Sequence, residues 1–303
     1  MRNRTTPLIY KIFKPKGASS FSVISSLKKE FPKSKDLKIG HFGTLDPFAE
    51  GLLLVGVYGA TRLNQYLQKE FSKTYEAKGI LGQKTTTGDL EGIIQEESSC
   101  ENLKEYSLLD LKQLLEEKFK GNYLQSPPSY SAAKHKGKSL YKYAQSGEII
   151  TKEPVQRFIH HLEILSFDFP YITFRATVGS GTYIRSLFED MANTLGTVGH
   201  LRELKRTSIG DQLVIDSIAP ETFGISKERG LRLDEVYPLA QIYLTPEEER
   251  KFCCGNNIKP DHLGLKIGDF LWVYGQEKSL MGMGEVKDAG LFPVWVFAQN
   301  AVS

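Results

Sequence analysis

Apolar residues recur along this chain in short runs, and the spacing within each run indicates which element it forms. From Ile172 to Val178, apolar side chains alternate with polar ones, which is the period of a half-buried strand. The run from Leu52 to Val57 is short and follows a glycine, so it fits a fully buried strand better than a helix. Such patterns predict strands over residues 8–13, 51–57, 73–81, 157–169, 171–178, 268–274 and 291–297.

Apolar residues at helical spacing predict several helices. Leu108, Leu111, Leu115 and Phe119 share one face of a helix over 108–119, and we expect that face to pack in the core. Other helices begin at residues that can cap them: Ser19–Ser22 before Val23, Ile24 and Leu27; Thr61 before Leu63, Tyr66 and Leu67; and Thr182 before Tyr183, Leu187, Met191 and Leu195. A further short helix is expected near 247–252.

Turn residues separate these elements and indicate the fold class. A turn-rich loop at 82–92 precedes an acidic surface segment around 96–105, and Pro127-Pro128 opens a basic loop. Strands and helices are mixed without strict βαβ alternation, so we predict an α+β fold around a largely antiparallel sheet rather than a doubly wound one. From about Leu244, short strands and turns predict a second, small β-barrel-like unit.

Length and cysteine content narrow the class of protein. A chain of 303 residues can bury a substantial core without disulfides, as one large domain and a small one. Its three cysteines lack CxxC spacing, which predicts a reducing compartment and no zinc site. Residues 1–10 lack the apolar stretch of a signal peptide, and no run approaches the roughly 18 apolar residues of a membrane span. We therefore expect a cytoplasmic protein with no membrane association.

The net charge of +3 is too small to predict a nucleic-acid partner, but the basic residues are unevenly placed. The stretch 134–142 holds Lys134, His135, Lys136, Lys138 and Lys142 without an acid, close to Tyr130, Tyr141 and Tyr143. Cations beside aromatic faces suit RNA, because phosphates meet the charges and unpaired bases stack on the rings. A solvated lysine-rich loop explains these residues equally well.

The loop from Gly40 to Pro47 places a lone carboxylate, Asp46, directly before the buried strand. Pro47 favours an extended Asp46, and the glycines allow turns that other residues disfavour. Such a rigid loop can mount a nucleophile, although Asp-Pro is also a common start of an ordinary turn. No second His or Cys lies at ligand spacing from His41, so we predict no metal site, and no P-loop is present.

The whole segment 40–62, with Asp46-Pro47 and Gly59-Ala60-Thr61-Arg62, resembles the signature of the TruB family of tRNA pseudouridine synthases. The resemblance implies a pseudouridine synthase fold, with a mixed, largely antiparallel central sheet flanked by helices, in a catalytic domain at 1–240. It also implies a basic RNA-clamp insertion at about 124–152 and a PUA-like RNA-binding domain at 241–303.

The resemblance implies the chemistry as well. The catalytic aspartate of the family corresponds to Asp46, the nucleophile, and an isomerisation of this kind needs no cofactor. The stretch 181–185, Gly-Thr-Tyr-Ile-Arg, matches the family motif whose arginine pairs with that aspartate and would keep it ionised. The alternative for Arg185 is a surface pair with Glu189. Tyr75 matches the tyrosine that stacks on the target base, although a strand tyrosine alone is more often a core residue.

Other residues correspond to family positions that contact RNA. His41 would act as a wedge against the extruded nucleotide, and Tyr183 and Leu204 would line the uracil pocket. The remaining predicted RNA-binding residues are Lys14, Tyr130, Lys134, Lys136 and Lys138. The implied partner is the T-arm of tRNA, whose uridine conventionally numbered 55 is flipped out by a monomeric enzyme. Gln145 and Lys205 stand where arginines are common in the family, which puts one phosphate contact in question.

Three other functions fit part of the sequence. The protein could be an RNA chaperone that folds the T-arm, or a synthase for another RNA, guide-directed or not. Intact Asp46, Tyr75 and Arg185 argue against an inactive enzyme but leave a second, chaperone role open. A hydrolase with Asp46 as nucleophile and His41 as base is the weakest alternative, because no oxyanion device is evident.

Overall fold

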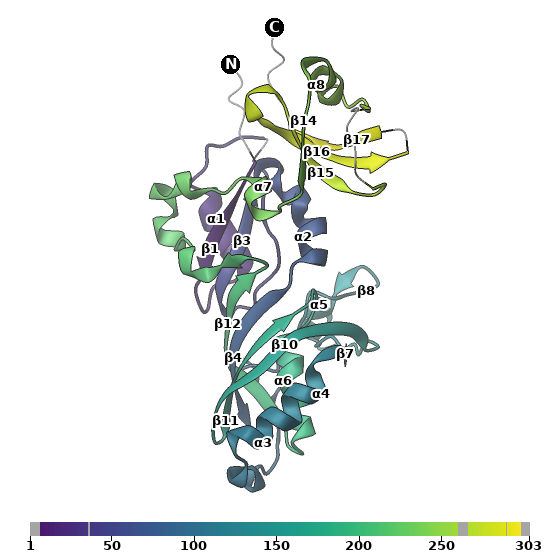
Figure 1. Cartoon of the computed structure of the whole chain (residues 1–303). Coiled ribbons are helices and arrows are strands. Elements are labelled where there is room, and N and C mark those ends of the chain that lie inside the picture. Colours follow the sequence, from purple (N-terminus) through teal and green to yellow (C-terminus); the bar gives the residue numbers. More distant parts are fainter. Residues whose placement is uncertain (1–6, 36, 260–265, 289, 298–303) are drawn as a thin grey trace.

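The computed structural model describes residues 7–35, 37–259, 266–288 and 290–297, and its main element is a 9-stranded mixed sheet (Figure 1). The strand order is β1-β3-β12-β4-β11-β10-β7, with β2 paired to β3 and β13 to β12. All these pairs are antiparallel except β3 with β12. The predicted α+β class with a largely antiparallel sheet is therefore confirmed. The strands are β1 (Leu8–Lys14), β2 (Ile39–His41), β3 (Glu50–Val57), β4 (Lys73–Leu81), β7 (Gly121–Gln125), β10 (Val155–Asp168), β11 (Tyr171–Val178), β12 (Gly199–Ile209) and β13 (Gln212–Leu213).

Strand β3 shows why the sequence folds in this way. Leu52 to Val57 are all buried, as the continuous apolar run predicts. Gly51 pairs in parallel with Arg206 of β12 and has φ +114°. A Cβ atom at this position would lie 2.3 Å from the Arg206 carbonyl oxygen, so only glycine allows the two strands to approach this closely.

The helices largely follow the predicted windows, but two predicted caps are wrong. α1 (Ser20–Lys28) is capped by Ser19, whose hydroxyl accepts from the Ser22 N–H. Thr61 lies inside a 3₁₀ turn (Tyr58–Leu63), and α2 (Asn64–Glu70) starts without a side-chain cap. α6 (Ile184–Thr194) begins after Tyr183, because the Thr182 hydroxyl donates to the Gly179 carbonyl instead of capping the helix.

One face of the sheet is covered by α6 and by a second helical stretch, α3 (Leu108–Leu111), a π-helical turn (Lys112–Glu116) and α4 (Glu117–Phe119). Leu111, Leu115 and Phe119 pack in the core against the inward residues of β10 and β11, as predicted. Leu108 is 37% exposed, so it was wrongly assigned to the buried face. No described helix has the length and apolar character needed to cross a membrane.

Two small hairpins extend from the sheet. The predicted loop at 82–92 and the acidic segment after it contain β5 (Gln83–Thr85) and β6 (Ile94–Glu97), which the sequence patterns missed, and a 3₁₀ turn (Glu101–Glu105). The basic loop forms the hairpin of β8 (Lys134–His135) and β9 (Lys138–Ser139), followed by α5 (Leu140–Gln145). Further 3₁₀ turns cover Val214–Asp216, Pro220–Ile225, Lys227–Arg229 and Gln276–Lys278.

The C-terminal part forms a 4-stranded sheet in the order β14-β15-β16-β17, yellow and green in Figure 1. Its elements are β14 (Ala240–Tyr243), α8 (Pro246–Cys253), β15 (Phe270–Tyr274), β16 (Leu280–Lys287) and β17 (Gly290–Val296), preceded by α7 (Leu233–Val236). The predicted helix and two strands are present, whereas β14 and β16 were missed. Trp272 and Trp295 share one apolar cluster with Phe42 and Leu52, so the two sheets pack on a common core.

Candidate active site

A pocket of about 240 Å³ lies where several distant segments of the chain meet. The Asp46 loop, strand β4, the turn before α6 and strand β12 each contribute side chains to its wall. Asp46, Tyr75, Tyr183 and Leu204, which were predicted from four separate motifs, all line this pocket. The remaining lining residues are Gly43, Thr44, Leu45, Gln68, Lys73, Ser131, Ala132, Val178, Gly179, Ser180, Gly181, Thr182, Ile184 and Arg206.

Asp46 and Arg185 form an ion pair, as the two motifs predict. Nε of Arg185 lies 2.9 Å from Oδ2 of Asp46. The carboxylate side chain is 33% exposed toward the pocket, whereas the arginine side chain is only 4% exposed. Such burial contradicts the alternative of an exposed Arg185–Glu189 pair on the helix surface. Asp46 is thus an accessible carboxylate that a buried cation holds in place.

The guanidinium of Arg185 is fixed on its other sides as well. Its Nη1 donates to the Thr87 carbonyl at 2.6 Å, and its Nη2 donates to the Tyr130 carbonyl at 2.9 Å. Asp89 lies 3.6 Å from Nη1 and is almost fully buried. Sequence reasoning missed Asp89, because an acid within a turn-rich stretch gives no signal of its own. These contacts restrict Arg185 to one orientation and leave its charge directed at Asp46.

The loop that carries Asp46 is held by buried side chains from other segments. Arg206, which is 1% exposed, donates to the carbonyls of Leu52, Thr44 and Gly43 at 2.7, 3.2 and 3.1 Å. The Ser20 hydroxyl donates to the Leu45 carbonyl and accepts from the Leu45 N–H, both at 3.0 Å. These two side chains bind three carbonyls of the loop, which restricts it in addition to its glycines and proline.

Lys14 was predicted to bind RNA, and its position contradicts this. The side chain is 0% exposed, and Nζ donates to the carbonyls of Pro15, Ala18 and Pro47 at 3.0, 2.7 and 3.2 Å. Burial lowers the pKa of Lys14 to about 8. With its ammonium group directed inward, Lys14 ties the residue after Asp46 to the start of α1 and is not free to meet a phosphate.

The described wall of the pocket carries more positive than negative side chains, which the sequence did not predict. Lys73 lines it beside Arg206, and its Nζ donates to the Phe71 carbonyl at 3.2 Å. Burial, followed by the nearby charge of Arg206, lowers the pKa of Lys73 to about 8. Asp46 is the sole carboxylate among the described lining residues. Such a pocket attracts an anionic ligand, for which the phosphates of RNA are suitable.

Tyr75 belongs to both the core and the pocket, so the two interpretations of this residue are compatible. It is buried in the cluster with Phe48 and Leu204, and the same residue lines the pocket beside Asp46. Leu204 is likewise buried, and Tyr183 is half-buried at the start of α6. Together these side chains form an apolar, partly aromatic wall next to the carboxylate, which is suited to a flat base.

His41 lies in the same loop but is not part of the described pocket wall. Its Nδ1 accepts a hydrogen bond from the Gly43 N–H at 3.3 Å. Burial and the nearby Arg206 lower the pKa of His41, so the ring is neutral at physiological pH. Because Nδ1 already accepts from the backbone, its lone pair is not available for the general base of a hydrolase, and the role of wedge stays a prediction.

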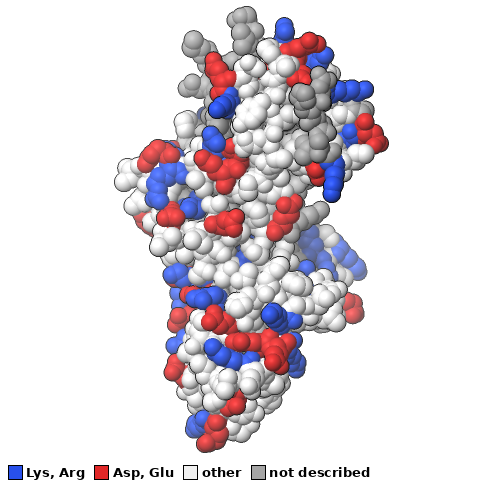
Figure 2. Space-filling model, viewed as in Figure 1, with Lys and Arg blue, Asp and Glu red and all other residues white. Residues whose placement is uncertain are grey.

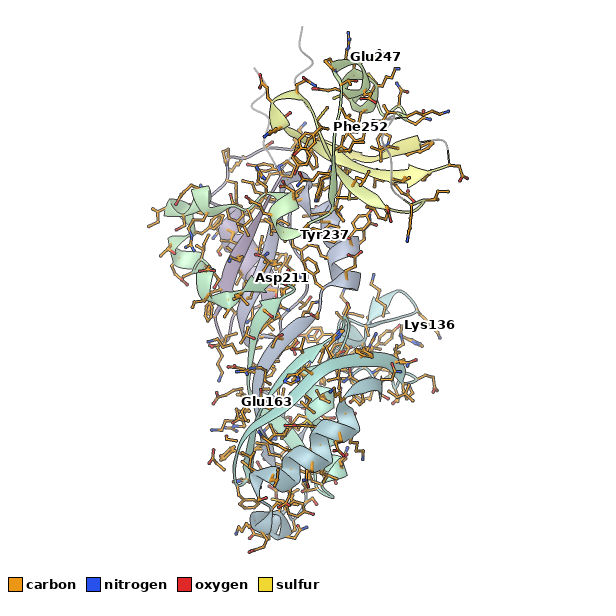
Figure 3. All side chains as sticks on the ribbon, in the orientation of Figure 1. Lys136, Glu163, Asp211, Tyr237, Glu247 and Phe252 are labelled. Atoms are coloured by element: carbon orange, nitrogen blue, oxygen red, sulfur yellow. The ribbon has the colours of Figure 1, made fainter. Side chains whose placement is uncertain are left out.

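The predicted RNA-binding lysines lie on the β8–β9 hairpin. Lys134, Lys136 and Lys138 are exposed, and Figure 3 shows Lys136 at the tip of the hairpin, pointing away from the sheet. Lys and Arg atoms gather over this hairpin at the right edge of the molecule in Figure 2. Tyr130 stacks edge-on against Tyr141, whose hydroxyl accepts from Gln145 at 2.9 Å. Gln145 thus binds Tyr141 within α5 and contributes no cation.

No group of three or more His, Cys, Asp and Glu residues in the described part of the chain is arranged to hold a metal ion. The described pocket wall has one carboxylate, Asp46, together with Lys73, the buried Arg206 and an apolar side, and the buried Arg185 pairs with the carboxylate. Such an arrangement supports covalent or ion-pair catalysis on a flat, uncharged ring rather than ligation of a cation.

Comparisons with known proteins agree with this class of site. The model of the TruB family pseudouridylate synthase (N terminal domain) matches residues 28–184. The "tRNA pseudouridine synthase B" of Thermosipho melanesiensis is 38% identical over 261 residues, which cover 86% of this chain and 83% of that protein. The protein of the same name from Clostridium tetani is 33% identical over 292 residues, covering 93% and 96% of the two chains.

Solved structures share the fold at lower identity. A chain in a structure titled as an H/ACA RNP bound to a substrate RNA aligns with a TM-score of 0.67 and 21% identity, covering 97% of this chain and 86% of that one. A chain of a Cbf5-Nop10-Gar1 complex gives 0.67 and 22%, covering 98% and 90%. By class this protein is an RNA-modifying isomerase, a pseudouridine synthase. Within that class, the chain belongs to the TruB family.

Proposed function

We propose that this protein is a tRNA pseudouridine synthase that isomerises the T-loop uridine conventionally numbered 55, with Asp46 as the nucleophile. The observation that carries the proposal is the Asp46–Arg185 ion pair of 2.9 Å at the wall of a pocket with an apolar, aromatic side. The names of the relatives at 33% to 38% identity support tRNA as the substrate.

The reaction breaks the C1′–N1 bond of uridine, turns the base and joins C1′ to C5. The C5 proton is lost and N1 gains one, so the step needs no cofactor and no redox change. The Asp46 carboxylate can form a transient covalent bond and later leave. Arg185 keeps that carboxylate in one orientation, which reduces the entropy lost on reaching the reactive geometry.

The target base must leave its stack to reach Asp46, at a cost of a few kcal/mol. In this proposal Tyr75, Tyr183 and Leu204 receive the base, and the neutral His41 ring occupies the space it leaves in the T-loop. Contact with the apolar wall and the wedge offsets the cost of flipping.

The rest of the T-arm is bound by shape and charge. Lys134, Lys136 and Lys138 meet phosphates outside the pocket, with Tyr130 beside them, and the insertion at about 124–152 acts as the clamp. The division into a catalytic domain at 1–240 and a PUA-like RNA-binding domain at 241–303 belongs to the same proposal, as does a monomeric, cytoplasmic enzyme.

Replacement of Asp46 by Asn tests the proposal. The variant keeps the shape of the side chain but loses the nucleophile, so tritium release from tRNA labelled with [5-³H]uridine should fall to background while RNA binding is retained. Retained turnover would exclude Asp46 as the nucleophile. Comparing how wild type and Asp46→Asn rescue the folding of a misfolded tRNA separates isomerase from chaperone function.

A further inference from the structure

The start of α6 is held by a side chain from another strand. The helix has no side-chain cap of its own at Tyr183. Instead, Oε1 of Gln125 accepts from the Tyr183 N–H at 2.8 Å, and Nε2 donates to the Tyr183 carbonyl at 2.9 Å. Gln125 is the last residue of β7 and is 1% exposed. One buried amide thus binds both main-chain groups of a residue in the pocket wall.

The segment after Gln125 is fixed a second time to the same helix. Residues 126–129 include Pro127-Pro128, and the next carbonyl, that of Tyr130, accepts from Nη2 of Arg185 at 2.9 Å. We call residues 125–130 the strap. Its two ends bind Tyr183 and Arg185, and the chain then passes through Ser131 in the pocket wall to the basic hairpin.

Behind Gln125, a buried network sets the orientation of its amide. The Tyr123 hydroxyl donates to Asp190 of α6 and lies 3.4 Å from Nε2 of Gln125. Burial, together with Asp190, raises the pKa of Tyr123, so its hydroxyl stays protonated. Because the Tyr123 hydroxyl donates its hydrogen bond to Asp190, its oxygen can only accept a hydrogen bond from the Gln125 amide. The network therefore favours the amide orientation in which Nε2 donates and Oε1 remains for the Tyr183 N–H.

Glutamine is the side chain that this position requires. The Tyr183 N–H needs an acceptor and the Tyr183 carbonyl needs a donor, and a planar amide presents both at once. Leucine offers neither group. Ionised glutamate can accept but cannot donate, whereas neutral glutamic acid can do both.

We infer that Gln125 is a positioning residue: its amide fixes the Tyr183 main chain and thereby aims Arg185 at Asp46, coupling the strap and its RNA-facing hairpin to the reacting carboxylate. Gln125 does not touch the pocket itself. The catalytic part of the inference rests on the proposed function, while the structural part does not.

Three full-length variants test the inference: Gln125→Leu, Gln125→Glu, and the control Gln156→Leu, an exposed glutamine on the neighbouring strand β10. Single-turnover and steady-state tritium release are measured with an unmodified tRNA transcript. Gln125→Leu should lower kcat by roughly 10²-fold, the effect of a misplacement of about 1 Å, with KM within about threefold of wild type. The control should match wild type.

Gln125→Glu provides a readout that a purely structural role would not move. As pH falls and the buried acid takes up a proton, its donor is restored, so its kcat relative to wild type should rise steadily from pH 8.5 to pH 6. The Gln125→Leu ratio should stay flat over the same range. Unchanged kcat in Gln125→Leu, or a Gln125→Glu ratio that does not vary with pH, would overturn the inference.

Amide hydrogen exchange keeps this result apart from the fate of the proposed function. In Gln125→Leu the Tyr183 amide should exchange faster than in wild type, while core amides of β3 keep their protection. This needs no RNA. If wild type releases no tritium, the proposed function fails. Faster exchange of the Tyr183 amide in Gln125→Leu would still support the structural role of Gln125. Unchanged exchange in that variant would refute this role.

Discussion

Nε of Arg185 lies 2.9 Å from Oδ2 of Asp46, although 139 positions separate the two residues in the sequence (185 − 46). The arginine also donates to the carbonyls of Thr87 and Tyr130, so three segments converge on one guanidinium. Arg185 is therefore both the counter-ion of Asp46 and the side chain that joins these three segments next to the pocket.

Arg185→Lys should retain the positive charge but lose the planar guanidinium, which contacts Asp46 and two carbonyls at once. The lysine ammonium group cannot contact Asp46 and the carbonyls of Thr87 and Tyr130 at the same time, so Asp46 loses its fixed orientation. We expect kcat to fall by roughly 10²-fold or more with RNA affinity little changed. Stopped-flow turnover with filter binding measures both quantities. An unchanged kcat would show that charge alone suffices.

Lys14→Met and Lys136→Met should affect different properties: Lys14→Met lowers stability, and Lys136→Met lowers RNA affinity. Lys14→Met removes a buried donor to three carbonyls, two of which also accept from main-chain N–H groups, so the free energy of unfolding should fall by about 1–3 kcal/mol. The salt dependence of RNA binding should not change, because Lys14 meets no phosphate. Urea unfolding and binding at several salt concentrations give the two quantities.

Lys136→Met removes an exposed charge, so stability should stay within about 0.5 kcal/mol of wild type. RNA affinity should weaken, and the slope of log K against log salt should fall by about 1. A loss of stability in Lys136→Met, or a reduced salt slope in Lys14→Met, would contradict the roles assigned to these lysines.

The free energy of unfolding should depend on pH in a way that reflects the lowered pKa of Lys73. Its pKa is about 8 in the folded protein against the ordinary lysine value of 10.5, so the unfolded chain binds more protons between these pH values. The free energy of unfolding contributed by this group rises with pH across that window, by at most about 1.4 kcal/mol per pH unit. Below pH 8 both states are charged, and the cost of burying the charge is fully present.

Lys73→Met lacks this contribution, and its curve of unfolding free energy should therefore be flatter than that of wild type between pH 8 and 10.5. Urea unfolding at half-unit pH intervals compares the two slopes directly. Parallel curves would mean that Lys73 is not desolvated in the folded state.

Trp295→Ala should destabilise the whole molecule rather than the C-terminal sheet alone. Trp295 packs in the cluster that contains Phe42 of the Asp46 loop, and Arg62 lies over its ring at 5.7 Å. A loss of about 3–5 kcal/mol is expected, as for other buried aromatic residues. Val294→Ala, at an exposed neighbour, is the control. Two separate unfolding transitions in wild type would argue against the shared core.

Sequence patterns located seven of the described strands, in which burial has a clear period, as in Ile172 to Val178, or the apolar run is continuous, as in Leu52 to Val57. They missed β12, which is rich in charged residues, and β14 and β16, whose residues alternate weakly or include glycines. They also missed the short strands β2, β5, β6, β7, β8, β9 and β13, which have too few residues to show a period. The Thr61 cap failed because Thr61 lies inside a 3₁₀ turn that precedes the helix, and the Thr182 cap failed because the Thr182 hydroxyl donates to the Gly179 carbonyl.

For the site, the motifs were sufficient to bring Asp46, Tyr75, Tyr183 and Leu204 together. They could not show that Lys14 points inward, because a surface lysine and a buried one look alike in a sequence. Asp89, Lys73 and Gln125 act through contacts with residues far along the chain, so only the three-dimensional arrangement shows what they hold.

The shared core of Phe42 and Trp295 has a mechanical consequence. A large apolar contact resists hinge motion, so the C-terminal sheet and the Asp46 loop stay at a constant separation. A ligand that contacts both parts must already span that distance. No binding free energy is then lost in bringing the C-terminal sheet and the Asp46 loop into position. Under the proposed function, an RNA that contacts both parts is therefore selected by its dimensions as well as by its bases.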